Sequence, residues 1–132
     1  LAGRYAPDGR WWPQDPLGAA RVQRWLSVAA GQLVQGPGNA RVAVLFGRPQ
    51  DPRCHEVAER LFTLMEAHLS GQDWLAATHP TLADVAMYTY TAHAPEGGVG
   101  LDAYPALRAW LARVEALPGF VGMVRSPAPA AA

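Results

Sequence analysis

The segment LADVAMYTYTA, residues 82–92, places the strongest constraint on the fold because it is apolar on nearly every side. A helix of this kind is stable in water only when other elements cover it. Thr81 and Asp84 stand three residues apart at its start, so the Thr81 hydroxyl can accept from the Asp84 N–H while the Asp84 carboxylate accepts from the Thr81 N–H. The pattern predicts a capped central helix that begins inside the protein, where unpaired amide groups have no water to bond.

A long helix is expected before this central one. Asp15 followed by Pro16 pairs an N-cap residue with the one helical position that favours proline. Apolar residues then recur at three- and four-residue spacing, at Val22, Leu26, Ala29 and Leu33. The helix is predicted over residues 16–35, with residues 36–38, Gly-Pro-Gly, ending it.

Three further helices complete the predicted fold. The run ARVAVLF, residues 40–46, is too short for its periodicity to separate strand from helix, and its helical neighbours favour helix. A second Asp-Pro start, residues 51–52, opens an amphipathic helix that ends at Gly71, and another amphipathic helix is predicted over residues 105–116. The expected fold is all-α, an irregular bundle of about five helices around the central helix.

Composition excludes several classes of partner. Eleven basic residues balance eleven acidic ones, which leaves no excess of positive charge for nucleic acid or an anionic membrane. All the basic residues are Arg, a bias typical of a GC-rich bacterial genome. With Cys54 as its only cysteine the chain can form no internal disulfide, so we expect a cytoplasmic location. No signal peptide or membrane anchor is expected. Because the chain begins with Leu1 rather than Met, we expect a fragment or a processed product.

Candidate catalytic and metal-binding residues are few. Cys54 and His55 are neighbours on a predicted helix, where side chains point about 100° apart, so they are not expected to form a nucleophile and its base. The remaining histidines lack the spacing of a metal site, and Asp84 is already accounted for by its capping role. We expect no metal and no catalytic residue in this chain. Trp25, Trp74 and Trp110 are expected in the core.

The order of the remaining motifs resembles the C-terminal domain of glutathione transferases. The motifs are Trp74-Leu75, Pro80-Thr81-x-Ala83-Asp84 before an apolar helix, Tyr104-Pro105, Trp110, and Leu117-Pro118-Gly119-Phe120. Tyr5, Trp12 with Pro16, and Arg24-Trp25-Leu26 resemble the end of the interdomain linker and the start of the first long helix. The resemblance implies a linker at residues 1–14, a helical domain at residues 15–124 and a flexible tail at residues 125–132. It also implies that Trp11 and Trp12, read as an exposed pair, pack against a further domain.

In this family a thioredoxin-like N-terminal domain binds glutathione and stabilises its thiolate, and none of that domain is present here. The resemblance implies that the helical domain supplies most of the pocket for an electrophilic substrate and much of a homodimer interface. Thr81 and Asp84 are structural residues in such a domain.

Four residues are candidates for substrate contacts. In bacterial relatives, the polar residue after the Trp-Leu start and a basic pair about seven residues further on line the glutathione cleft. These positions hold Ser27, Val34 and Gln35, which share one helix face across Gly31. The alternative is an ordinary solvated face. Arg41 is a candidate anion contact.

The resemblance implies that the intact parent is a glutathione S-transferase and that this chain alone is inactive. Two alternatives stay open: a non-catalytic binding or scaffold protein, and a glutathione-dependent reductase or isomerase. A Ser or Tyr at the start of the missing domain favours conjugation, whereas a Cys favours redox chemistry.

Overall fold

The fold was obtained from a computed structural model, which describes residues 1–130. Its helical elements are, in chain order, α1 Ala2–Tyr5, α2 Pro16–Ala30, a π-helical turn η1 Val34–Gly38, α3 Asn39–Leu45, α4 Pro52–Leu69, α5 Leu82–Ala92, a 3₁₀ turn η2 Ala94–Gly97 and α6 Pro105–Glu115. No strand occurs within the described residues. The all-α prediction is therefore confirmed.

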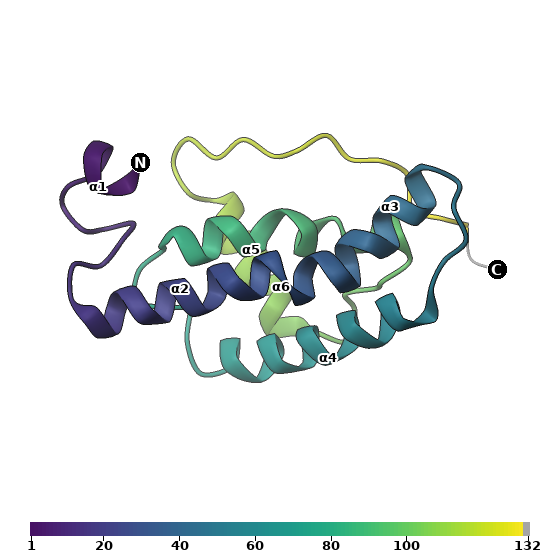
Figure 1. Cartoon of the computed structure of the whole chain (residues 1–132), viewed down its shortest axis with the longest axis horizontal. Coiled ribbons are helices and arrows are strands. Elements are labelled where there is room, and N and C mark those ends of the chain that lie inside the picture. The colour runs from purple at the N-terminus through teal and green to yellow at the C-terminus, as the bar shows by residue number, and fades with distance from the viewer. Residues whose placement is uncertain (131–132) are drawn as a thin grey trace.

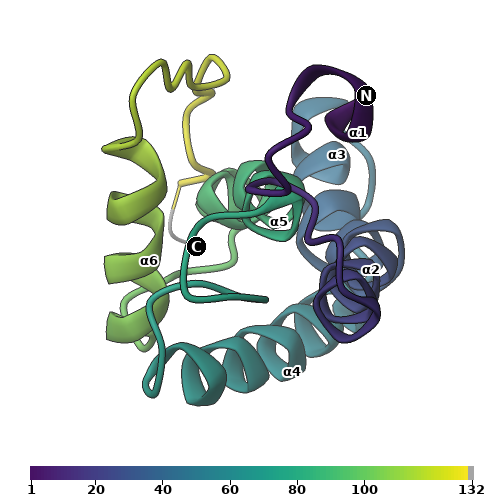
Figure 2. The ribbon, with the colours of Figure 1, turned by 90° about the vertical axis from the view of Figure 1, so that its left-hand side faces the viewer.

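The helices are arranged around α5. Seen end-on, α5 lies between α6 on one side and α2 and α3 on the other, with α4 closing the side below (Figure 2). The core between them holds large side chains that are almost completely buried: Val22, Trp25, Leu33, Phe62, Met65, Met87, Leu107 and Trp110. Trp74, also predicted in the core, is half-buried and packs against it.

The helix starts follow from local sequence. Asp15 accepts from the Gly18 N–H at 2.7 Å and Asp51 accepts from the Arg53 N–H at 2.9 Å, and each is followed by proline. These bonds satisfy amide groups that a helix leaves unpaired at its start. The ranges of α3, α4 and α6 agree closely with the predicted ones.

The predicted end of the first helix is wrong. Residues 36–38 do not end the helical path, because α2 gives way to the π-helical turn η1 and the chain runs straight into α3 (Figure 1). A widened turn accommodates Pro37, which has no N–H to donate and whose ring crowds the preceding turn. Gly36 allows close contact with α4, since a Cβ there would lie 2.8 Å from the Ala58 nitrogen. These residues are a buried packing point and not a break.

The start of α5 has the predicted capping box, and Asp84 accepts two further hydrogen bonds there. The Thr81 hydroxyl accepts from the Ala83 N–H at 3.2 Å, and the Asp84 carboxylate accepts from the Thr81 N–H at 2.9 Å. The same carboxylate accepts from the Leu75 N–H at 3.0 Å and the Trp110 indole N–H at 2.8 Å. Asp84 is fully buried, so it joins the loop before α5 to α6 as well as capping α5.

A second carboxylate caps α6 from a distance in sequence. Glu66, in the last turns of α4, accepts from the Ala106 N–H at 2.9 Å and the Leu107 N–H at 2.8 Å. These are the first free N–H groups of α6, because Pro105 has none. Glu66 thereby fixes α6 against α4.

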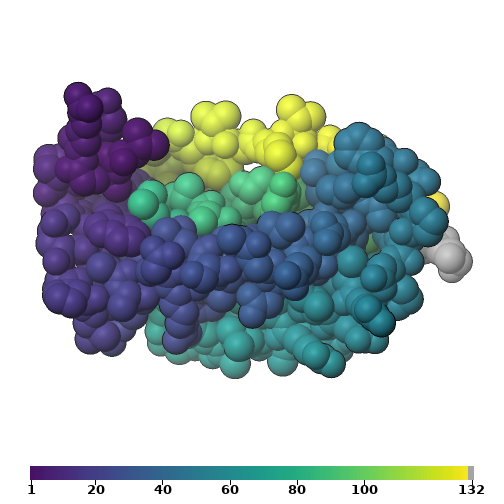
Figure 3. Space-filling model, viewed as in Figure 1, coloured from purple at the N-terminus to yellow at the C-terminus, as the bar shows by residue number. Residues whose placement is uncertain are grey.

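Part of α5 is uncovered, in contrast to the fully wrapped helix that was predicted. Val85 is 51 % exposed and Tyr90 is 36 % exposed, whereas the opposite side of the helix is buried. Figure 3 shows this surface of α5 between α2 and the extended C-terminal segment. We call the exposed side, with Val85 and Tyr90, the open face of α5.

Segments near both ends of the described chain, residues 11–12 and 125–126, contact the bundle. Trp11 and Trp12 are half-buried rather than exposed; the Trp11 carbonyl accepts from the Leu82 N–H at 3.0 Å, and Trp12 packs on the core. After α6, residues 121–130 run extended across the top of the molecule towards α3 (Figure 1). We call this segment the C-terminal strap. The last two residues of the predicted flexible tail, 131–132, lie outside the described residues.

A search of the described residues found no helix with the length and apolar character of a membrane span.

Replacing Asp84 by Ala is expected to lower the free energy of unfolding by about 3 to 4 kcal/mol, because it leaves three buried donors without an acceptor. Thr81→Ala is expected to cost about 1 kcal/mol. Since both side chains serve one cap, the double variant should be little worse than Asp84→Ala. Urea unfolding measures all three.

Asp102→Ala is the matched control, since Asp102 is exposed, and it should change stability by less than about 0.5 kcal/mol. Fully additive losses in the double variant would contradict the shared cap.

Candidate functional site

The residues predicted to line a cleft lie on the outer surface of this chain. Ser27 and Gln35 are exposed, and Val34 is 38 % exposed. The Ser27 hydroxyl donates to the Gln23 carbonyl at 3.1 Å, one turn back on α2. None of them lines the pockets of about 690 and 680 Å³. Their substrate contacts stay a prediction.

Arg41 is occupied inside the protein. Its Nε donates to Glu96 Oε2 in an ion pair, and the side chain is only 13 % exposed. The residue lies in α3 and its partner in η2, which pack against each other. Only the two terminal nitrogens of the Arg41 guanidinium group could bind a substrate anion, because Nε is paired with Glu96. The anion contact of Arg41 stays a prediction.

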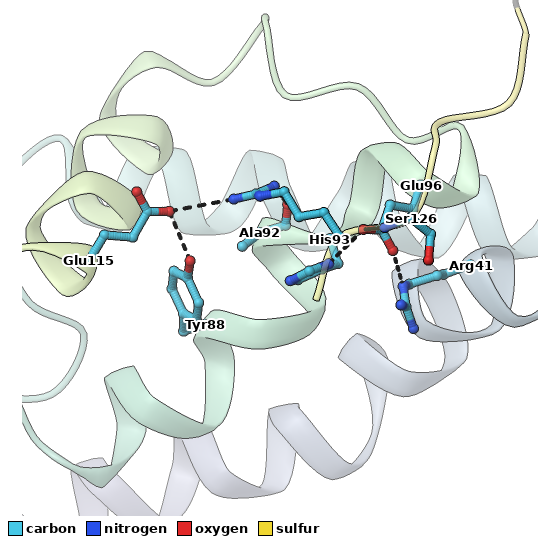
Figure 4. A network of polar contacts seen from close by, with 8 residues as sticks. Arg41, Tyr88, Ala92, His93, Glu96, Glu115 and Ser126 are labelled. Carbon is cyan, nitrogen blue, oxygen red and sulfur yellow. Dashed lines mark hydrogen bonds and ion pairs between the residues drawn. The ribbon is translucent and has the colours of Figure 1, made fainter. Parts of the chain in front are cut away.

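Glu96 is the centre of a buried polar network (Figure 4). Besides Arg41, it accepts at Oε1 from His93 Nδ1 at 2.7 Å and from the Ser126 N–H at 2.8 Å. Because an ionised carboxylate only accepts, the Nδ1 of His93 carries a proton. The network joins α3, the end of α5, η2 and the C-terminal strap.

The partners of Glu96 decide its ionisation. Burial alone would raise the pKa of this carboxyl, but hydrogen bonds from Arg41, the Ser126 N–H and His93 outweigh burial and lower the pKa to about 2. Glu96 is therefore ionised at neutral pH.

A second polar group anchors the strap on the other side of α5. The Tyr88 hydroxyl donates to Glu115 Oε1 at 2.8 Å, and Arg125 Nη2 lies 3.7 Å from the same oxygen. Burial and the hydrogen bond to the ionised Glu115 raise the pKa of Tyr88 to about 12. Arg125 also donates to the Ala92 carbonyl at 3.4 Å. Tyr88 is thus a neutral donor, with no sign of activation as a base.

The open face of α5 carries two exposed side chains, Val85 and Tyr90. The Tyr90 ring packs over Gly38, where a Cβ would lie 3.5 Å from a ring carbon. The open face lies between two anchored ends of α5, with Asp84 at the start and Glu96 just beyond the end.

Sequence reasoning missed Glu96 and its network. A His and a Glu three residues apart, His93 and Glu96, were a weak local signal. Their partner Arg41 lies 55 residues away, and no local pattern connects it to them. No group of three or more potential metal-binding side chains is found within the described residues.

Glu96 should make stability depend on acid pH. Because its folded pKa is about 2 and its ordinary value is 4.5, the ionised carboxylate stabilises the fold fully above about pH 4.5 and loses this contribution as the pH falls towards 2. Glu96→Gln should cost about 3 kcal/mol at pH 6 and clearly less at pH 2.5. Denaturant unfolding at both pH values measures the difference.

Glu59→Gln, on the exposed side of α4, is the control and should show a small difference that does not change with pH. A cost of Glu96→Gln that is equal at both pH values would show that the low pKa is wrong.

Comparison with known proteins places this chain in a family. Residues 46–118 match the family model described as "Glutathione S-transferase, C-terminal domain". Glutathione S-transferase theta-1 of Mus musculus is 31 % identical over 130 residues, which cover 90 % of this chain and 54 % of the relative. Theta-1 of Bos taurus is 30 % identical, covering 92 % and 55 %. The chain thus spans about half the length of the curated relatives it matches.

Solved structures of glutathione S-transferases are similar to this chain in fold. The crystal structure of a glutathione S-transferase from Pseudomonas fluorescens has a TM-score of 0.82 at 30 % identity, over 90 % of this chain and 62 % of that one. A glutathione S-transferase from Xanthobacter autotrophicus has a TM-score of 0.77 at 34 % identity, over 85 % and 58 %. The sequence match and the shared helical fold give the same answer: this chain belongs to the glutathione S-transferase C-terminal domain family.

Proposed function

We propose that this chain is the C-terminal half of an enzyme that conjugates glutathione to electrophilic small molecules. The observation that carries the proposal is the match to proteins named as glutathione S-transferases over nine-tenths of this chain and about half of theirs. A bacterial source fits the all-arginine composition and the bacterial structures at 30 % and 34 % identity.

In this proposal residues 15–124 are the helical domain, and residues 1–14 are the linker from a thioredoxin-like domain that binds glutathione. The open face of α5 supports this division, because Val85 and Tyr90 are apolar side chains without a cover in this chain. The contacts of Trp11 and Trp12 with the bundle would fix the direction in which the linker leaves it.

Conjugation needs a thiolate that attacks an electrophilic carbon, forming a carbon–sulfur bond as the leaving group departs with its electron pair. The group that stabilises the thiolate would come from the other domain. This chain would contribute an apolar wall that excludes water and holds the electrophile in place. Cys54, in the first turn of α4, has no part in this proposal.

Ser27, Val34 and Gln35 are proposed to face the substrate in the intact protein, as the resemblance implies. Their exposure supports this, because a side chain already packed in the core could not reach a ligand. We also propose a homodimer and a cytoplasmic location, the latter because of the single cysteine.

A chimera tests the proposal. The N-terminal half of the Pseudomonas fluorescens relative, joined to this chain at the linker, should conjugate glutathione to 1-chloro-2,4-dinitrobenzene, whereas this chain alone should not. The assay follows the product by absorbance. A folded chimera without activity, or an active isolated chain, would contradict the division of labour.

Ser27→Leu and Gln35→Leu in the same chimera should each change the KM for glutathione or for the electrophile by about threefold or more, with stability nearly unchanged. Arg108→Leu is the control, because Arg108 is exposed on α6, away from the helical path that carries Ser27 and Gln35. If all three variants have wild-type kinetics, Ser27 and Gln35 belong to a solvated face.

A further inference from the structure

A pocket of about 690 Å³ opens on a different part of the molecule from Ser27, Val34, Gln35 and Arg41. It lies between the first half of α2, the C-terminal end of α4 and residues 72–79, and in Figure 1 these meet at one end of the bundle. We call it the α2–α4 pocket. Its volume is in the range of small-molecule sites.

Two arginines on one side of α2 line this pocket. Arg21 and Arg24 are three residues apart, so their side chains are neighbours on the helix surface. The Arg24 guanidinium lies 5.5 Å from the centre of the Trp25 ring. Within residues 1–130 neither arginine has an ion pair or a side-chain hydrogen bond.

The acidic residues of the pocket do not balance these charges. Asp73 lies 3.9 Å from Arg113, which sits outside the pocket and offsets its charge. Asp15 accepts from the Gly18 N–H as the N-cap of α2. Two guanidinium groups and two carboxylates thus line the pocket, and Arg113 beside Asp73 adds a third cation at its edge, which leaves a local excess of one positive charge.

The wall of the pocket that Trp25 and Leu75 form is fixed in place. Trp25 and Leu75 are almost completely buried, and the Trp25 indole N–H donates to the Leu75 carbonyl at 3.1 Å. His68 Nε2 donates to the same carbonyl at 2.7 Å, so this wall is tied to α4 as well. The Thr78 side chain adds a hydroxyl at the rim.

We propose that the α2–α4 pocket binds a small organic anion, with the carboxylate, sulfonate or phosphate group held by Arg21 and Arg24 beside Trp25, and the apolar part resting against Pro13 and Ala77. Guanidinium groups bind such anions through paired, charge-assisted hydrogen bonds. The partly exposed apolar side chains of Pro13 and Ala77 favour an anion with a hydrocarbon part over an inorganic one. This binding is independent of the proposed conjugation, because the pocket contains none of Ser27, Val34, Gln35 and Arg41.

Phenyl phosphate is a suitable probe for the full chain. We expect it to bind with a Kd of about 1 mM or tighter by calorimetry, and to shift the Trp25 indole N–H resonance more than that of the other tryptophans. Benzyl alcohol and inorganic phosphate should each bind more weakly than phenyl phosphate. Raising the salt concentration from 0.05 to 0.5 M should weaken binding through charge screening.

Arg21→Gln and Arg24→Gln should each weaken binding about threefold, and the double variant about tenfold. The matched control is Arg108→Gln, since Arg108 is exposed on α6 and lies outside the pocket; it should bind as the wild type does. Because all three arginines are on the surface, circular dichroism should show an unchanged fold.

The proposal is overturned if the wild type does not bind phenyl phosphate, if the double variant binds as tightly as the wild type, or if Trp25 is unaffected. Phenyl phosphate that binds no more tightly than inorganic phosphate would overturn the assignment of an organic ligand.

Discussion

The packing of the bundle depends on the hydrogen bonds that the buried Asp84 carboxylate accepts. Burying a carboxylate is costly unless its oxygens are well supplied with donors. Here the donors come from the Thr81 and Leu75 backbone and the Trp110 indole. Leu75 extends this set of hydrogen bonds to α2, since its carbonyl accepts from the Trp25 indole N–H. One chain of hydrogen bonds thus runs from α6 through α5 and the preceding loop to α2.

This arrangement makes α5 a fixed element with one side left open. Asp84 holds its first turn, and the network of Glu96 with Arg41 and His93 holds the chain just after its last turn. Both networks are buried, and within the described residues no buried side-chain nitrogen or oxygen lacks a partner. A helix that is held at both ends is already ordered before a ligand or another domain binds, which lowers the entropic cost of binding. The open face of α5 suits such a use.

The features that could be predicted from sequence are those whose partners are close together in the chain. The capping box spans Thr81 to Asp84, and each Asp-Pro start lies within one turn of the helix that it begins. The further donors to Asp84, the cap supplied by Glu66 and the ion pair of Arg41 all join residues that only the fold brings together. Residues 36–38 were misread for a related reason, because Gly36 packs closely against the backbone of Ala58 in α4, a contact that the local sequence does not reveal.

Charge shows the same limit of sequence reasoning. A net charge of zero argues against long stretches of nucleic acid or an anionic membrane, since both respond to charge summed over a wide surface. A small ligand responds to charge within a Debye length of about 8 Å, and at that scale pairing matters more than the sum. Arg41 and Glu96 cancel each other inside the protein, and Arg113 offsets Asp73. Arg21 and Arg24 form no ion pair within the described residues, although Asp15 and Asp73 line the same pocket.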